Sequence, residues 1–194
     1  MAGPTPIYQA SPPSVQHALR QGEILTNLIQ IHLDLQTIGL PEPRVTPRRH
    51  EYALVLSQDC DLDLDFNARA GTISADKLIP CVLFCEVITA QELRFGPGGM
   101  NSTIWGNVRA NKHERYQFLQ KVEPTEDCSG KGFPELGIDF KRYFTIQADE
   151  VYRRIELGEA QRRCVLSSPY LEHLCRRFAN YLSRVALPLD HLSE

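Results

Sequence analysis

The chain has 194 residues, of which 42% are hydrophobic and 23% are charged, and its formal net charge at pH 7 is -3. This composition excludes general disorder, and the negative net charge excludes a global attraction to nucleic acid, so any contact with phosphates would need a local basic patch. No apolar run of about 20 residues and no secretory signal pattern occurs, and the six cysteines include no Cys-x-x-Cys pair. We therefore expect a cytoplasmic protein with no membrane contact and no cofactor.

The first predicted segment is an arm. Residues 1–14 contain four prolines and are expected to be disordered or extended. After a short helix predicted to end near Gly22, β-branched and apolar runs predict strands joined by loops. The strands are expected over residues 23–36, 51–66, 77–93, 113–122 and 138–155.

The last predicted element is an amphipathic helix over residues 168–187. Ser168 is suited to cap its N-terminus and Pro169 fits its first position, while apolar residues recur every three or four positions to form one stripe. Pro188 would end the helix. The sequence thus predicts a mainly β, α+β fold with a single globular domain at residues 15–194, in which this helix packs on a small SH3-like β-barrel over about residues 22–156.

An acidic run, Asp59 to Asp65, follows the apolar start of the second predicted strand. Because side chains alternate faces along a strand, Cys60 would face the core, while the aspartates at positions 59, 61, 63 and 65 would face solvent or a basic partner. Asp59 and Asp61 are weak candidates for metal ligands: the run lacks the glycine and glutamate of a calcium loop, and same-face neighbours on a strand lie about 7 Å apart. We therefore expect no metal site.

A hydrolase site is an alternative interpretation of the same run. A β-bulge near Gln58 would turn Cys60 and Asp61 into a pocket with His50, where the Cys60 thiol or the Asp61 carboxylate could carry out hydrolysis. Neighbouring carboxylates and apolar burial both disfavour a thiolate, which opposes this interpretation.

Three short stretches resemble the MazF/PemK toxins. They are GEIL at residues 22–25, RRHEYALVLS at 48–57 and IPCVLFCEVITAQ at 79–91, which follow the order of the opening strand, the arginine-bearing loop with its next strand, and the central strand of that family. The resemblance covers the first half of the chain and implies an SH3-like barrel and metal-independent RNA cleavage. It implies that Arg49 or Arg48 stabilises charge on the phosphorane and that Thr89 serves the same site.

The sequence also departs from this family. His50 stands where the family has a proline, the acidic run would repel RNA phosphates, and the second half of the chain has no counterpart. The chain also resembles uncharacterised bacterial proteins that combine an SQ-x-CDL stretch with a C-terminal helix, a group that implies no activity.

Basic residues that could contact nucleic acid are concentrated in two places. Arg44, Arg48 and Arg49 lie in the predicted loop before the second strand, and His113 and Arg115 are interleaved with aromatic residues further along the chain. Basic and aromatic side chains together can bind single-stranded nucleic acid. Alternation on a half-buried strand produces the same pattern without a ligand.

Two classes of function stay open. The first is a non-enzymatic interaction module, a component of a bacterial toxin–antitoxin or phage-defence system, which the acidic run, the proline-rich arm and the basic face of the C-terminal helix favour. The second is an endoribonuclease of the MazF/PemK type. We favour the interaction module because the sequence departs from the family where the chemistry would need agreement. Its expected partner is a protein encoded in the same operon, with RNA or a second copy of the chain as alternatives.

Overall fold

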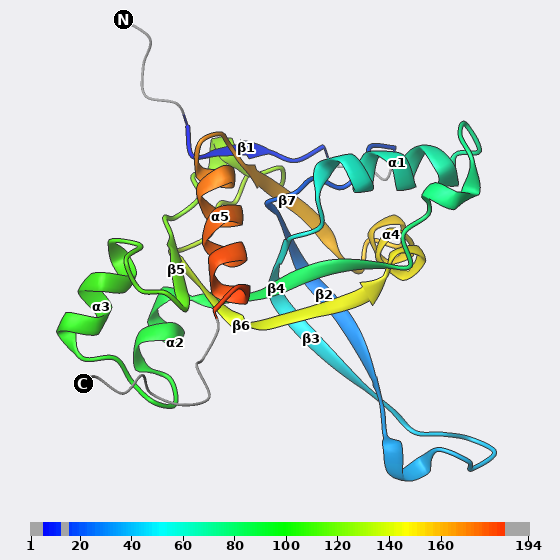
Figure 1. Cartoon of the computed structure of the whole chain (residues 1–194), viewed down its shortest axis with the longest axis horizontal. Helices are drawn as coiled ribbons and strands as arrows, with labels where there is room; N and C mark the ends of the chain where they lie inside the picture. Colours follow the sequence, from blue (N-terminus) through cyan, green and yellow to red (C-terminus); the bar gives the residue numbers. More distant parts are fainter. Residues whose placement is uncertain (1–5, 13–15, 185–194) are drawn as a thin grey trace, which may run out of the picture.

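The computed structural model describes residues 6–12 and 16–184 of the chain. Within these residues, seven strands form one antiparallel sheet in the order β1-β7-β2-β3-β4-β6-β5 (Figure 1). The strands are β1 (Tyr8–Ala10), β2 (Glu23–Leu33), β3 (Val45–Val55), β4 (Cys81–Thr89), β5 (Tyr116–Leu119), β6 (Leu136–Gln147) and β7 (Gln161–Leu166). The α-helices are α1 (Asp59–Arg69), α2 (Ala90–Phe95), α3 (Ser102–Arg109), α4 (Ala148–Glu156) and α5 (Tyr170–Leu182). Short 3-10 helices are η1 (Leu35–Thr37), η2 (Ala75–Lys77) and η3 (Pro124–Glu126).

Helices cover both faces of the sheet (Figure 1). Helix α5 contributes Leu174 and Phe178 to one buried cluster, and α1 and α4 contribute Leu62 and Val151 to a second cluster on the other face. Trp105 of α3 belongs to a third, smaller cluster beside β5. Because β4 supplies residues to both large clusters, its apolar run is nearly continuous. No helix in the described part of the chain is long and apolar enough to cross a membrane.

The sheet is open, which corrects the predicted barrel. The hydroxyl of Tyr8 in the edge strand β1 donates a hydrogen bond to the carbonyl oxygen of Gln120, just after β5, at 2.8 Å, but no ladder joins β1 to β5 in the described residues. At the outer edge of β5, the side chain of Asn111 accepts a hydrogen bond from the backbone nitrogen of Phe118 at 2.7 Å and donates one to its carbonyl oxygen at 3.2 Å. The Asn111 side chain thus occupies the backbone N–H and C=O of Phe118, with which a further strand would pair, so the sheet ends at β5.

The acidic run forms helix α1, and the predicted strand over residues 59–66 is therefore wrong. The two buried side chains of the helix, Leu62 and Asp65, are three positions apart, which is a helical spacing. Asp59 and Asp61 lie in the first turn, where the helix dipole favours negative charge. The alternation of leucine and aspartate is thus compatible with a strand pattern although it belongs to a mostly exposed helix.

Strand β7 is missing from the predicted elements, and residues 148–156 form α4 instead of continuing a strand. The sequence of β7 contains Arg162 and Arg163, which suggest an exposed segment, yet both side chains are buried in ion pairs with Glu23 and Asp127. Residues 16–22 contain no helix, so the short helix predicted before Gly22 is also wrong.

The predicted C-terminal helix is confirmed as α5. It begins at Tyr170 with Pro169 as its N-cap, one residue later than the predicted cap Ser168. Pro188 lies outside the described residues. In the predicted arm, residues 6–12 are described, and β1 pairs with β7 and buries Tyr8, which is 2% exposed. The arm therefore contributes a strand to the sheet.

Strands β2 and β3 extend beyond the rest of the sheet. Strand β2 pairs with β7 only over Glu23–Thr26, and β3 pairs with β4 only over Tyr52–Val55, whereas β2 and β3 pair with each other as far as Leu33 and Val45. Residues 28–50 are called here the β2–β3 ribbon. Leu28 and His50 at its base are buried, whereas its far part, with η1 near the end, projects from the body of the molecule (Figure 1).

Candidate functional site

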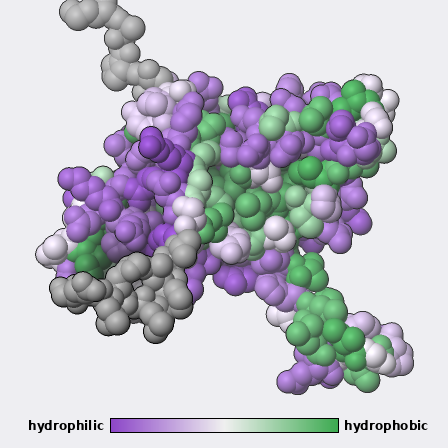
Figure 2. Space-filling view, viewed as in Figure 1, coloured by the Kyte–Doolittle hydropathy of each residue, from purple (hydrophilic) through white to green (hydrophobic). Residues whose placement is uncertain are grey.

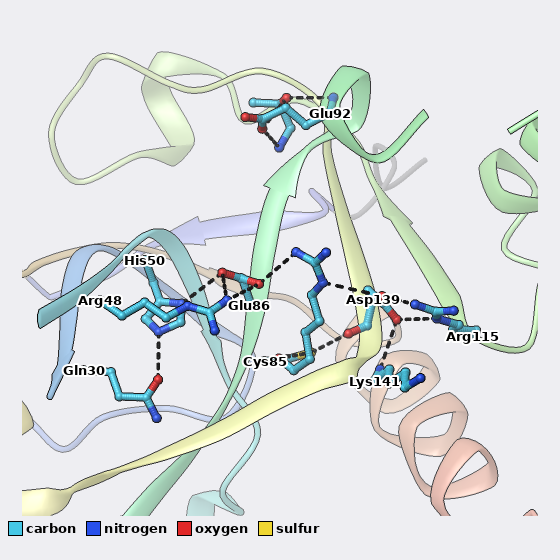
Figure 3. A network of polar contacts seen from close by, with 11 residues as sticks. Gln30, Arg48, His50, Cys85, Glu86, Glu92, Arg115, Asp139 and Lys141 are labelled. Atoms are coloured by element: carbon cyan, nitrogen blue, oxygen red, sulfur yellow. Dashed lines mark hydrogen bonds and ion pairs between the residues drawn. The ribbon is translucent and has the colours of Figure 1, made fainter. Parts of the chain in front are cut away.

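Several predicted site residues lie in a polar array that crosses the sheet, shown in Figure 3. The arginine–carboxylate array alternates three guanidinium groups with two carboxylates, in the spatial order Arg48, Glu86, Arg142, Asp139 and Arg115. Arg48 donates to the two oxygens of Glu86 at 2.9 and 3.1 Å, and Arg142 donates to Glu86 at 3.1 Å. The array thereby links β3, β4 and β6 through side chains as well as through backbone hydrogen bonds.

Glu86 is the carboxylate of the array that lies nearer to β3. Its side chain is 12% exposed, and one of its oxygens lies 3.3 Å from Nδ1 of His50. The buried His50 ring stacks on Phe144 with ring centroids 3.9 Å apart. Hydrogen bonding with His50 lowers the pKa of Glu86, burial opposes that shift, and the arginines lower the pKa further, to about 2. Glu86 is therefore ionised at neutral pH and cannot serve as a proton donor there.

Asp139 and Cys85 complete the β6 side of the array. Arg115 donates to both carboxylate oxygens of Asp139, at 2.7 and 2.6 Å, in a bidentate pair that raises the pKa of Arg115. The thiol of Cys85 lies 3.4 Å from the carbonyl oxygen of Asp139, and burial raises the pKa of this thiol well above its usual range. The described members of the array are therefore paired charges and a neutral thiol, which stabilise the sheet but are not activated for acid, base or nucleophilic chemistry.

The residues predicted for RNA cleavage do not meet. Arg48 is bound to Glu86, and Arg49 donates to the side-chain oxygen of Asn27 at 2.6 Å. Thr89 is the N-cap of α2, where its hydroxyl donates to Glu92 at 2.7 Å. It lies three residues beyond Glu86, about 10 Å along β4, and Figure 3 shows Glu92 well apart from the array.

The residues predicted for a hydrolase are also separated. Cys60 is exposed in the first turn of α1, with its sulfur 3.8 Å from a carboxylate oxygen of Asp61. His50 lies five residues, about 17 Å, before the end of β3, with Nε2 3.2 Å from the side-chain oxygen of Gln30. Asp61 lines a groove between α1, β4 and α5, but Cys60 does not. The structure therefore brings no thiol, carboxylate and imidazole together at this position.

Asp59, the other candidate ligand, serves as a structural anchor. It accepts hydrogen bonds from the Arg20 side chain at 3.1 Å and from the backbone nitrogen of Gln21 at 2.7 Å. No group of three or more histidine, cysteine or acidic side chains is placed to hold a metal ion within residues 6–12 and 16–184. The acidic run instead holds α1 in place.

Asp65 has the most buried carboxylate of the run. Its side chain is fully buried, accepts from Arg69 at 2.7 and 2.9 Å, and accepts from the backbone nitrogen of Ile79 at 2.9 Å. Asp65→Ala is expected to lower the free energy of unfolding by about 1.5–3 kcal/mol, because hydrogen bonds to a buried charge are lost. Urea unfolding measures this change. Asp63→Ala on the exposed face of α1 is the control, and equal losses in the two variants would contradict the anchoring role.

The remaining basic candidates are dispersed. Arg44 is exposed on the β2–β3 ribbon, where its backbone nitrogen donates to the hydroxyl of Thr37 at 2.8 Å. His113 lies beyond the opposite side of the array, with its ring 4.8 Å from that of Tyr116 and its Nδ1 accepting from the backbone of Arg115 at 3.2 Å. The five predicted nucleic-acid contacts therefore form no continuous basic patch.

An exposed apolar surface on the β2–β3 ribbon is the feature that the sequence analysis missed. Six large side chains here are between 45% and 75% exposed, and we call them the apolar tip: Ile31, Leu33, Leu35, Ile38, Leu40 and Val45. Figure 2 shows this hydrophobic surface at the end of the ribbon, away from the body. The available signal was a strand rich in leucine and isoleucine that runs into a long loop with three prolines, but sequence alone does not show that both emerge from the sheet.

No family model matches the sequence, and no curated protein matches it significantly. The resemblance to MazF/PemK toxins therefore stays a prediction.

Proposed function

We propose that this protein is a non-enzymatic interaction module that binds a protein partner through the β2–β3 ribbon. The observation that carries the proposal is the apolar tip, whose six side chains lie on a projecting ribbon. Contiguous exposed apolar surface is uncommon on monomeric proteins and is typical of interaction sites. The partner we expect is the product of a neighbouring gene in a toxin–antitoxin or phage-defence system.

The geometry of the ribbon supports a role in binding. Beyond Thr26 on β2 and Tyr52 on β3, the two strands pair only with each other among the described residues. A two-stranded ribbon is marginally stable in water by itself. Contact with a partner would bury the apolar tip, which the rest of the sheet leaves exposed, and would thereby stabilise the end of the ribbon.

The charges on the ribbon favour a protein partner over a nucleic acid. Near its end the ribbon carries two carboxylates, Asp34 and Glu42, and one guanidinium, that of Arg44. The arginines closer to the sheet are engaged, Arg48 by Glu86 and Arg49 by Asn27. Binding to a phosphate backbone requires several available cations, so this surface is suited to an apolar surface of another protein.

The triple variant Leu35→Ser/Ile38→Ser/Leu40→Ser is expected to lose the partner. Tagged full-length protein is purified from cells that co-express the neighbouring genes, and the co-purified proteins are quantified. We expect the wild type to recover one partner in stoichiometric amount and the triple variant to recover roughly tenfold less or lower, because the apolar contact is removed.

Phe95→Ser/Leu157→Ser is the matched control, because these side chains are 71% and 60% exposed but lie outside the ribbon. It should recover the partner as the wild type does. Light scattering of the wild type distinguishes a second copy of the chain from a different partner. Equal recovery by both variants would contradict the proposal, as would a monomeric wild type that recovers no stoichiometric partner.

A further inference from the structure

The β2–β3 ribbon has a free strand edge along β2. Strand β7 pairs with β2 only as far as Thr26, and Asn27, with a φ of 63°, follows directly. From there to Leu33, β2 pairs with β3 on one side and has no strand on its other side among the described residues. Such an edge presents backbone N–H and C=O groups with which a further strand can pair.

The pairing with β3 shows which backbone groups of β2 face outward. The backbone nitrogen of Asp34 donates to the carbonyl oxygen of Arg44 at 2.9 Å, and the register of the ladder continues from this pair. Residues that bond across an antiparallel ladder alternate with residues that do not. Ile29, Ile31 and Leu33 therefore direct their N–H and C=O groups to the outer edge.

This edge lacks the features that block other edges of the described sheet. On the outer edge of β3, Pro47 lies opposite Ile31 and has no N–H, and the charged Arg49 follows. Beside β5, the side chain of Asn111 occupies the backbone groups of the edge. Residues 27–33 contain no proline, lysine, arginine or acidic residue. Proteins usually protect an unpaired edge with such residues, so an edge without them is suited to pairing.

We propose that the protein partner adds an extended strand to the outer edge of β2, a mode of binding that rests on the proposed function of the ribbon. The outward groups recur about every 7 Å and include both donors and acceptors. An extended polypeptide matches both, whereas a phosphate backbone only accepts. Ile31 and Leu33 are exposed on one face of this edge, so the added strand should carry apolar side chains at alternate positions.

A second copy of the chain fits this edge less well than a different protein. Two β2 edges paired antiparallel about Ile31, the middle of the edge, would set Asp34 of one copy opposite Leu28 of the other. Leu28 is fully buried, and Asp34 is held as the N-cap of η1. A carboxylate would then face an apolar, buried position, which is unfavourable. We therefore assign the added strand to a different protein.

Hydrogen exchange of single amides, followed by NMR, tests strand addition. In the free full-length chain, the amides of Ile29, Ile31 and Leu33 should exchange roughly tenfold or more faster than those of Leu28 and His32, which bond to β3. In the complex purified from cells that co-express the neighbouring genes, the three outward amides should slow by roughly tenfold or more.

The outcomes separate strand addition from the proposed function. A stoichiometric partner that leaves the three amides unprotected would overturn strand addition and leave the proposed function standing. If no stoichiometric partner is recovered, both are overturned. A dimer of the chain alone that protects the same amides would overturn the assignment of the strand to a different protein.

Ile31→Pro removes one outward N–H and no hydrogen bond within the ribbon. Ile31→Val is the matched control, because its side chain is similar in size to the proline ring and its N–H remains. We expect Ile31→Pro to bind the purified partner roughly tenfold or more weakly than Ile31→Val does. Slow exchange at Leu28 and His32 in the proline variant checks that the ribbon is still paired. Equal affinities of the two variants with the ribbon paired would overturn the proposal, and if the ribbon were unpaired, exchange in the wild-type complex would still decide.

Discussion

Replacing Glu23 with alanine is expected to lower the free energy of unfolding by about 3–5 kcal/mol. The side chains of Glu23 and Arg162 are 0% and 1% exposed, and two nitrogens of Arg162 lie 2.6 and 2.9 Å from the carboxylate oxygens. Arg162 also donates to the carbonyl oxygens of His17 and Ala18, at 2.8 Å each. In the variant the guanidinium would stay buried without this counter-charge. Removing one partner of a buried ion pair destabilises the fold strongly, because the remaining charge is not compensated. Urea unfolding followed by circular dichroism measures the loss.

Two further variants separate burial from charge pairing. Glu159→Ala removes a carboxylate that is 47% exposed and paired with Arg154, and it should cost less than about 1 kcal/mol. Glu23→Leu/Arg162→Met removes both buried charges and should be less destabilised than Glu23→Ala. If Glu23→Ala and Glu159→Ala lowered the free energy of unfolding by equal amounts, the buried Glu23–Arg162 pair would contribute no more to stability than an exposed pair, which would contradict this prediction.

Glu86→Gln is expected to destabilise the protein by about 3 kcal/mol at pH 7 and to have no such effect near pH 2. The array lowers the pKa of Glu86 from 4.5 to about 2, and each pKa unit corresponds to about 1.4 kcal/mol of preference for the charged form in the folded state. A carboxyl group with a lowered folded pKa stabilises the fold fully above its unfolded pKa. That contribution decreases as the pH falls from about 4.5 to about 2, because protons then bind the unfolded chain first.

Urea unfolding of the wild type and of Glu86→Gln at intervals between pH 2 and pH 7 gives the required comparison. Glu156→Gln, at an exposed glutamate on α4, should stay within about 0.5 kcal/mol of the wild type at each pH. If the difference in free energy of unfolding between wild type and Glu86→Gln did not change with pH, the array would not favour the ionised form of Glu86.

Helix α5 and strand β4 could be predicted because their sequences carry a clear apolar pattern. The stripe of α5 repeats at the helical spacing, and the nearly continuous apolar run of β4 is typical of a strand covered on both faces. The acidic run was predicted wrongly because alternating leucine and aspartate also fits an exposed helix, with Leu62 and Asp65 as its only buried side chains. Strand β7 was missed because burial of Arg162 depends on Glu23, a partner far away in sequence.

The sequence identified several members of the array but not their roles. Arg48, His50 and Arg115 were recognised as basic residues near strands, whereas Glu86 and Asp139, which bind them, lie in runs that showed no acidic pattern. A basic side chain is available to a ligand only when it forms no ion pair with a carboxylate of the protein. Whether it forms one depends on which distant strands lie next to each other. The apolar tip is hidden for a similar reason, because exposure depends on where the neighbouring strands end.

The strand order also determines when the sheet can be completed during synthesis. Strand β7 lies between β1 and β2, and the ion pair that joins it to Glu23 spans 139 residues of sequence. Strand β2 therefore leaves the ribosome with a carboxylate that lacks its counter-ion, and its edge toward β7 stays unpaired until β3, β4 and β6 have all been made. Such distant contacts slow folding because a long loop must close before they form. A chain cut short before residue 161 would lack the strand that joins β1 to the rest of the sheet.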